Sequence, residues 1–170
     1  SSASLTINGV TFEVGNTTGA NWSLSTSNIY TGNSGTEGVT GQVGELLRYF
    51  RYGPANDNAT LTLTGLVAGE TYTTTWYNKN WSGGVSGRVA DITANDDGTT
   101  FTFDQNNSGN PSMLRYAFVA PASGSITYTF ANGSNSFHQY GFSNELTSTP
   151  NQWDVAGGGS WNATGNWSDA

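Results

Sequence analysis

Short segments in which bulky apolar residues alternate with threonine and other polar residues recur along this chain, and they constrain its fold more than any other feature. The clearest are MLRYAFVA at 113–120 and SITYTFA at 125–131. Successive side chains of a strand point to opposite faces, so this alternation predicts strands with one buried face. The large side chains of the two segments are expected to pair as inward-facing rows: Leu114, Tyr116 and Phe118 with Ile126, Tyr128 and Phe130.

The same pattern predicts more strands on both sides of these two. They are expected at 4–14, with a turn or bulge at Asn8 and Gly9, and at 45–53, 59–66, 71–79, 88–94, 99–105 and 136–146. The segment 45–53 carries aromatic residues on both of its faces, so we expect it to be covered on both sides. The segment 15–44 follows no period and is interpreted as long surface loops, with one short strand at 22–24.

Eight or nine strands at this spacing predict an all-β fold. We expect a two-sheet antiparallel sandwich of the jelly-roll type rather than the immunoglobulin type, with almost no helix because the best helix formers are scarce. The sandwich domain is expected to span residues 1–146, and a Gly- and Trp-rich terminal segment, 147–170, is expected to form an extended C-terminal tail.

The charge and cysteine content narrow the function classes. A net charge of −7 with only 5 basic residues argues against nucleic acid as a partner. The absence of cysteine excludes disulfides, thiolate metal sites and a cysteine nucleophile. No stretch is apolar enough to insert into a membrane. A surface rich in Thr, Asn and Gly with a single lysine is typical of bacterial extracellular proteins, and no signal peptide precedes Ser1, so we expect a mature secreted or cell-surface chain.

Several motifs in the second half of the chain follow one another in an order that is typical of one family of domains. They are the turn GLVAGETY at 65–72, the strand APASGSITYTF at 120–130 and the closing strand YGFSNEL at 140–146. Across residues 45–146 the chain resembles a β-sandwich domain of large secreted and surface-anchored bacterial proteins, similar to the jelly rolls of carbohydrate-binding modules. The terminal segment WDVAGGGSWNATGNWSD resembles the Trp/Gly repeats of autotransporter-like surface proteins. The resemblance implies an extracellular module and brings no functional residues with it.

The residues offer little for catalysis. His138 is the only histidine, and no nucleophile elbow or glycine arrangement for an oxyanion hole accompanies it. Most of the 12 acidic residues lie among Asn and Gly, where they favour turns rather than the facing pair of carboxyl groups that glycoside hydrolysis needs. We therefore expect the chain not to be an enzyme.

No cofactor is expected to be required. Turn-forming acids and amides can supply the oxygen ligands that Ca²⁺ prefers, so a structural calcium ion is the one metal that the sequence allows. The candidate ligands are acidic residues of the second half of the chain: Asp96, Asp97, Asp104 and Glu145. Plain turns are the competing interpretation, and the EF-hand spacing is absent.

Aromatic residues outside the core alternation are the more informative feature. Sugar rings stack on exposed aromatic faces while their hydroxyl groups bond Asn, Asp and Gln. The segment WYNKNWSGG, with Trp76 inward, predicts a glycan-binding patch made of Tyr77, Asn78, Asn80 and Trp81. The competing interpretation is that Trp81 only covers the end of the sandwich.

The terminal segment raises a second function. Ordering a glycine-rich tail costs about 1–2 kcal/mol for each residue, and burial of the three indole rings of Trp153, Trp161 and Trp167 is the main available compensation. The rings can pack on the sandwich of their own chain or on that of a neighbouring copy. If they bind a neighbouring copy, the chain is a non-catalytic structural or adhesive module that self-associates into a surface fibre or matrix. The alternative is a carbohydrate-binding module of a larger secreted protein, with a polysaccharide as its partner.

Overall fold

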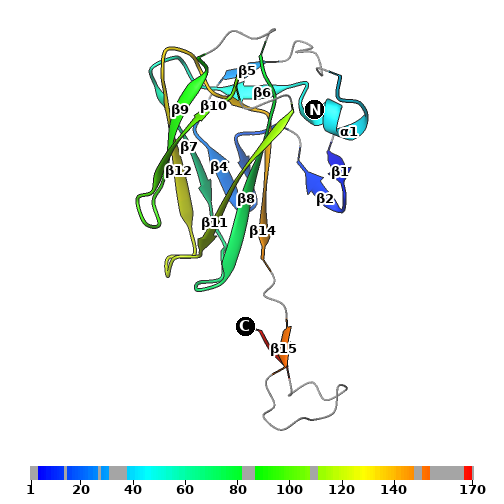
Figure 1. Cartoon of the computed structure of the whole chain (residues 1–170), viewed down its shortest axis with the longest axis vertical. Coiled ribbons are helices and arrows are strands. Elements are labelled where there is room, and N and C mark those ends of the chain that lie inside the picture. The colour runs from blue at the N-terminus through cyan, green and yellow to red at the C-terminus, as the bar shows by residue number, and fades with distance from the viewer. Residues whose placement is uncertain are drawn as a thin grey trace.

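The computed structural model describes residues 4–13, 15–26, 28–30, 38–81, 87–107 and 111–147, together with the backbone of 151–153 and 167–169. Every strand pairing in this described part is antiparallel. Two main sheets lie face to face, as Figure 1 shows, and the predicted antiparallel two-sheet sandwich is confirmed.

The larger sheet has six strands and contains the centre of the core. Its order is β10 (Thr100–Asp104), β9 (Val89–Ala94), β12 (Ile126–Asn132), β7 (Asn58–Leu63), β4 (Trp22–Leu24) and β3 (Thr18–Gly19). The inward side chains of β12 are Ile126, Tyr128 and Phe130, and each is 0% exposed. The alternation in SITYTFA therefore places one full face of the central strand in the core.

The smaller sheet has three strands, in the order β11 (Ser112–Val119), β8 (Thr71–Asn78) and β14 (Gly141–Leu146). Trp76 of β8 is buried and packs edge-on against Tyr128, with ring centroids 4.8 Å apart. The rows predicted on 113–120 and 125–131 do face inward, and Tyr116 contacts Tyr128 at 5.8 Å. However, β11 and β12 belong to opposite sheets, so the rows meet across the sandwich rather than as hydrogen-bonded neighbours.

Three small sheets complete the described strands. One has the order β13 (His138–Gln139), β6 (Phe50–Tyr52) and β5 (Asn28–Tyr30). The second is the N-terminal hairpin of β1 (Leu5–Ile7) and β2 (Val10–Phe12), and the third pairs β15 (Asn151–Trp153) with β16 (Trp167–Asp169). The predicted strand at 136–146 is thus divided between β13 and β14.

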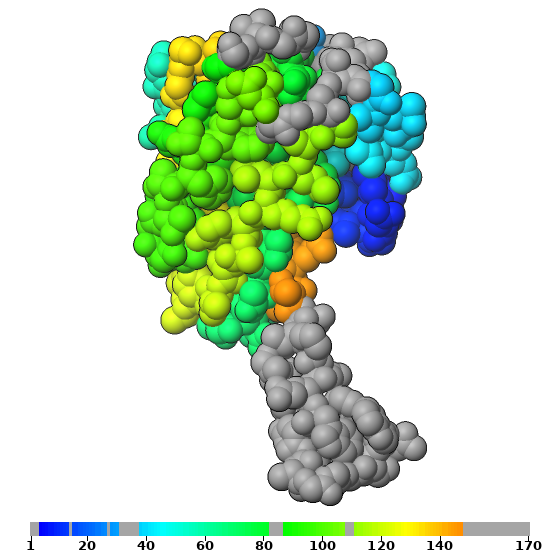
Figure 2. Space-filling model, in the orientation of Figure 1, coloured from blue at the N-terminus to red at the C-terminus, as the bar shows by residue number. Residues whose placement is uncertain are grey.

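The turn of the N-terminal hairpin confirms the expected break at Asn8 and Gly9. Both residues have positive φ, +50° and +83°. This is the backbone of the tight hairpin turns for which Asn-Gly is the favoured sequence. The hairpin packs beside β14 and the helix, as the blue segment of Figure 2 shows.

The prediction of a strand over 45–53 is wrong in its first half. The chain forms a short helix there, α1 (Gly41–Leu46), and only β6 is extended. Val43, Leu46, Leu47 and Phe50 follow the spacing i, i+3, i+4, i+7 of a helical apolar face, and the alternation seen from residue 45 onward hid that pattern. In the described part of the chain, no helix is long and apolar enough to cross a membrane.

The two main sheets differ in width, and this difference positions the candidate site. Neighbouring strands lie about 4.8 Å apart, so three strands cannot cover the inner face of six. The strands β4 and β3 form one side of the large sheet, and β14 is an edge of the small one. The N-terminal hairpin lies over the space between them.

Candidate functional site

A cavity of about 700 Å³ occupies the space between β4, β14 and the N-terminal hairpin. Its walls come from the hairpin and the loop after it, from β4, from β6 and from the segment 139–144. This volume lies within the range of about 300–1,000 Å³ that is usual for small-ligand sites.

Aromatic rings form much of the wall. The indole of Trp22 on β4 meets Phe142 on β14 edge to face, with centroids 5.4 Å apart, and so links the two sheets at the cavity. Phe12 of β2 packs edge to face on Tyr77 at 5.3 Å, which attaches the hairpin to the sandwich. Tyr49 also lines the cavity and is half-buried. These rings provide apolar surface of the kind on which a sugar ring stacks.

A carboxylate lies beside the indole of Trp22. A Cβ atom placed on Gly19 would be 2.0 Å from Nε1 of Trp22 and 2.6 Å from Oε2 of Glu13. The two polar atoms are therefore neighbours above the bare backbone of Gly19, and any side chain at that position would displace them. The pair offers one hydrogen-bond donor and one acceptor at the same wall of the cavity.

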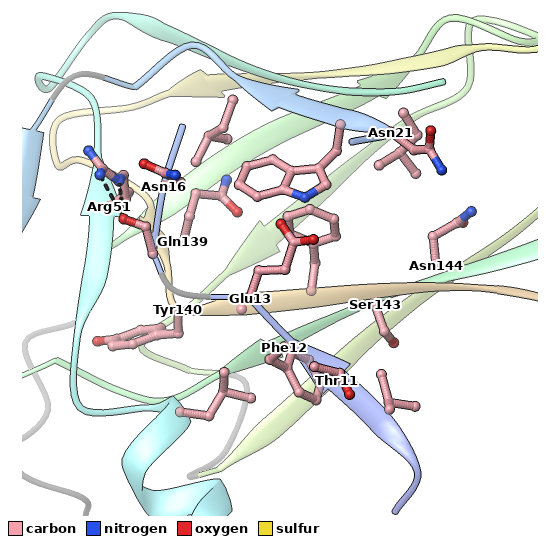
Figure 3. Close-up of a pocket in the computed structure, with 18 of the residues that line it drawn as sticks. Thr11, Phe12, Glu13, Asn16, Asn21, Arg51, Gln139, Tyr140, Ser143 and Asn144 are labelled. Atoms are coloured by element: carbon pink, nitrogen blue, oxygen red, sulfur yellow. Dashed lines mark hydrogen bonds between the residues drawn. The ribbon is translucent and has the colours of Figure 1, made fainter. Parts of the chain in front are cut away.

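Gln139 supplies a second donor, and it lacks an acceptor. The residue is 9% exposed, and no hydrogen-bond partner for its Nε2 atom is found among the described residues. Figure 3 shows the side chains of Gln139 and Glu13 extending into the same cavity. A buried amide N–H without an acceptor costs roughly 1–3 kcal/mol, and a ligand oxygen would relieve this penalty once the amide, whose Nε2 atom is closed to solvent, turns toward the cavity.

Arg51 holds the loop that carries Glu13. Its guanidinium donates from Nε and from Nη2 to the carbonyl oxygen of Gly15, at 3.2 and 2.7 Å. The dashed lines of Figure 3 mark this contact at the margin of the cavity. Arg51 therefore ties the segment of Glu13 and Asn16 to β6.

None of the four residues of the predicted glycan-binding patch lines the cavity. Asn78 is 1% exposed and accepts a hydrogen bond from Nε2 of Gln105 at 3.0 Å. Trp81 packs edge to face against Tyr30 and Phe50, and Tyr77 holds Phe12. Asn80 is half-buried. Glycan binding by these residues stays a prediction from the sequence.

His138 lies in a ring cluster and not in a catalytic arrangement. It stacks on Phe50 with centroids 3.8 Å apart, and its Nδ1 atom is 3.4 Å from the hydroxyl oxygen of Tyr140. Burial, with smaller contributions from the positive charges of Arg88 and Lys79, lowers the pKa of His138 to about 2. The imidazole is thus neutral at physiological pH and packs as an aromatic ring.

The four candidate calcium ligands lie at three separate places in the fold. Asp96 and Asp97 form the turn between β9 and β10, Asp104 ends β10, and Glu145 lies on β14. Hydrogen bonds from Thr99 lower the pKa of Asp97, and Asp104 accepts from the backbone N–H of Asn106 at 3.0 Å. Among the residues that the structure describes, no group of three or more His, Asp or Glu can hold a metal ion. Structural calcium stays a prediction.

The terminal tryptophans fall largely outside the described residues. For Trp153 and Trp167 the backbone is described, and the two residues are register partners in the β15–β16 pair. Trp161 lies outside the described part altogether. Self-association through these residues is therefore still a prediction.

Sequence reasoning missed the residues that line the cavity. Glu13, Trp22, Arg51 and Gln139 come from four distant segments, and none belongs to a recognisable motif. The one local signal was that Trp22 lies outside the core alternation.

Comparisons with known proteins agree on the fold. No family model matches the chain, and no curated protein matches it. Among solved structures, the plant receptor-like kinase ANX2 matches with a TM-score of 0.50 at 15% identity, over 73% of this chain and 38% of that one. A family 35 carbohydrate-binding module from Clostridium thermocellum matches with a TM-score of 0.47 at 12% identity, over 72% and 89%.

A third structure is an enzyme domain. The enzymatically active domain of tailspike protein 4 from bacteriophage CBA120 matches with a TM-score of 0.41 at 16% identity, over 75% of this chain and 20% of that one. At these identities the ANX2 match shows a shared fold. The chain is a β-sandwich, and it shares this fold with ANX2.

Proposed function

We propose that the chain is a non-catalytic, extracellular glycan-binding module whose ligand occupies the cavity between β4, β14 and the N-terminal hairpin. The observation that supports this most directly is the Nε2 atom of Gln139, which is buried at the cavity wall without an acceptor among the described residues. A sugar hydroxyl oxygen accepts such a donor, and the rings of Trp22 and Tyr49 offer faces for its C–H groups. The proposal agrees with the resemblance of residues 45–146 to carbohydrate-binding modules.

The composition of the cavity favours binding over hydrolysis. Among its described lining residues, Glu13 is the one acidic side chain. Glycoside hydrolysis commonly needs two carboxyl groups on either side of the scissile bond. A single carboxylate next to an indole N–H suits hydrogen bonding to hydroxyl groups instead.

Self-association into a fibre is the other function that the sequence suggests. No contact between the described residues favours self-association. The prediction depends on the tryptophans of the terminal segment, and their side chains are not among the described ones. The glycan-binding proposal is therefore the one that the described residues support.

Replacing Gln139 with methionine tests the proposal. The variant Gln139→Met keeps the volume of the side chain and removes the orphan donor, so glycan affinity should fall about tenfold. The free energy of unfolding without ligand should rise by about 1 kcal/mol, because a desolvation penalty disappears. Affinity is measured by glycan array followed by calorimetry, and stability by urea unfolding.

Gln42→Met is the matched control, because Gln42 lies on the exposed side of α1 and does not line the cavity. Gln42→Met should change neither the glycan affinity nor the free energy of unfolding. A Gln139→Met protein that is less stable and binds a glycan as tightly as the unmodified chain would show that Gln139 has a structural role only. A chain that binds no saccharide at all would refute the proposed function.

A further inference from the structure

We infer that the cavity selects a neutral saccharide over an anionic one and that Glu13 is the specificity-determining residue. This inference rests on the proposed function and deepens it, because it names the chemical class of the ligand. It follows from where the two charged side chains of the described cavity wall, Glu13 and Arg51, direct their charges.

The side-on edge of the positively charged Arg51 is engaged by the protein. Both Nε and Nη2 of Arg51 donate to the carbonyl oxygen of Gly15, and this contact lies at the margin of the cavity (Figure 3). A guanidinium that binds a carboxylate side-on uses two such N–H groups in parallel. Arg51 thus uses its side-on edge to fix the loop of Glu13, and only its Nη1/Nη2 edge, at the margin of the cavity, remains for a ligand.

The negative charge faces the ligand. Oε2 of Glu13 lies within 2.6 Å of the position that a Cβ atom on Gly19 would take, next to Nε1 of Trp22. Figure 3 shows the carboxylate of Glu13 inside the cavity with Gln139. The acceptor of Glu13 and the donors of Trp22 and Gln139 together match neighbouring hydroxyl groups, each of which can both donate and accept.

A uronic acid would bring a second carboxylate into this cavity. Glu13 is exposed in the free chain, and a bound sugar would cover it, so two like charges a few ångströms apart would then repel by enough to cost about tenfold or more in affinity. The net charge of −7 on the whole chain adds to the repulsion of anionic polymers. A neutral hexose of the same ring stereochemistry carries a hydroxymethyl group instead of the carboxylate and avoids this cost.

Sugar pairs that differ only in this carboxylate provide the test, whichever ring stereochemistry the cavity accepts. The probes are oligosaccharides of galactose and galacturonic acid, of glucose and glucuronic acid, and of mannose and mannuronic acid. Binding to the unmodified chain is measured by calorimetry at low and at high salt concentration. In the pair that binds, the neutral member should bind at least about tenfold more tightly in low salt, and the difference should narrow in high salt because salt screens the repulsion.

The variant Glu13→Gln isolates the carboxylate. The amide still accepts a hydrogen bond from a hydroxyl group, and the charge is gone, so the affinity ratio between the neutral and anionic members should fall to about 3 or less. The matched control is Glu70→Gln, which removes the same charge from an exposed turn that does not line the cavity. It should leave the ratio unchanged.

The outcomes separate the inference from the proposed function. If the uronic acid member binds the unmodified chain as tightly as its neutral partner, or if Glu13→Gln leaves the ratio unchanged, the inference is overturned and glycan binding stands. If no member of any pair binds, both fail together.

Discussion

His138 shows how an isolated titratable residue becomes a structural one. It is the only histidine of the chain, it is 4% exposed, and the faces and edges of Phe50, Trp81, Tyr52 and Tyr140 surround it. Burial and the nearby cations Arg88 and Lys79 depress its pKa to about 2. Below the usual histidine pKa of about 6.5, a proton therefore binds the unfolded chain and not the folded one.

This difference predicts a loss of stability in mild acid. The free energy of unfolding should fall by about 2 kcal/mol between about pH 7 and pH 5, where the carboxyl groups contribute little. Urea unfolding at the two pH values measures the change. In the variant His138→Phe, which keeps an aromatic ring on Phe50, the free energy of unfolding should hardly change between these two pH values. A flat profile for the unmodified chain would contradict the burial of a neutral histidine.

At the scale of elements, the position of α1 depends on a glycine of β14. A Cβ atom on Gly141 would lie 2.9 Å from Cδ1 of Leu46, closer than packed carbon atoms approach. The bare backbone thus lets the helix place a buried leucine directly on the start of the strand. The same strand continues into the cavity wall at Phe142 and Ser143.

Gly141→Ala should therefore push α1 away from β14 and lower the free energy of unfolding by about 1–3 kcal/mol, the usual cost of overpacking. Chemical denaturation measures the change. Gly53→Ala is the control, since its Cβ atom would meet Asn132 at an ordinary 3.7 Å and Gly53 does not line the cavity. Equal stability of the two variants would argue against the tight contact with Leu46.

At the scale of the whole molecule, the sandwich and the N-terminal hairpin should differ in local stability. The strand β12 lies between β9 and β7 with its inner face in the core, whereas β1 and β2 pair only with each other in the described sheets. A two-stranded hairpin is marginal without packing, and this one depends on contacts such as that of Phe12 with Tyr77.

Hydrogen exchange should resolve this difference. The amides of β1 and β2 should exchange at least about a hundredfold faster than those of β12, and a saturating glycan should slow the hairpin selectively because it lies over the cavity. Mass spectrometry of the deuterated protein reports both effects. Uniform exchange across the hairpin and β12 would mean that they open together.

Elements with a local pattern could be predicted from the amino-acid sequence. Alternation in 125–131 specifies β12 as a strand with one buried face, and Asn8-Gly9 specifies a tight turn, because strand period and turn chemistry act over a few residues. The sandwich class follows from the number of such strands. The helix at 41–46 escaped prediction because the alternation that begins at residue 45 overlaps its helical apolar spacing over so short a stretch.

Only the tertiary structure determines which sheet each strand joins. It also determines where a cavity remains between the sheets. Strands β11 and β12 are consecutive in sequence yet lie in opposite sheets, and the cavity exists because three strands cover six. Glu13, Trp22, Arg51 and Gln139 meet there although they are widely separated along the chain. Such contacts depend on sheet width and packing, which are properties of the assembled chain and leave no mark on any local stretch of sequence.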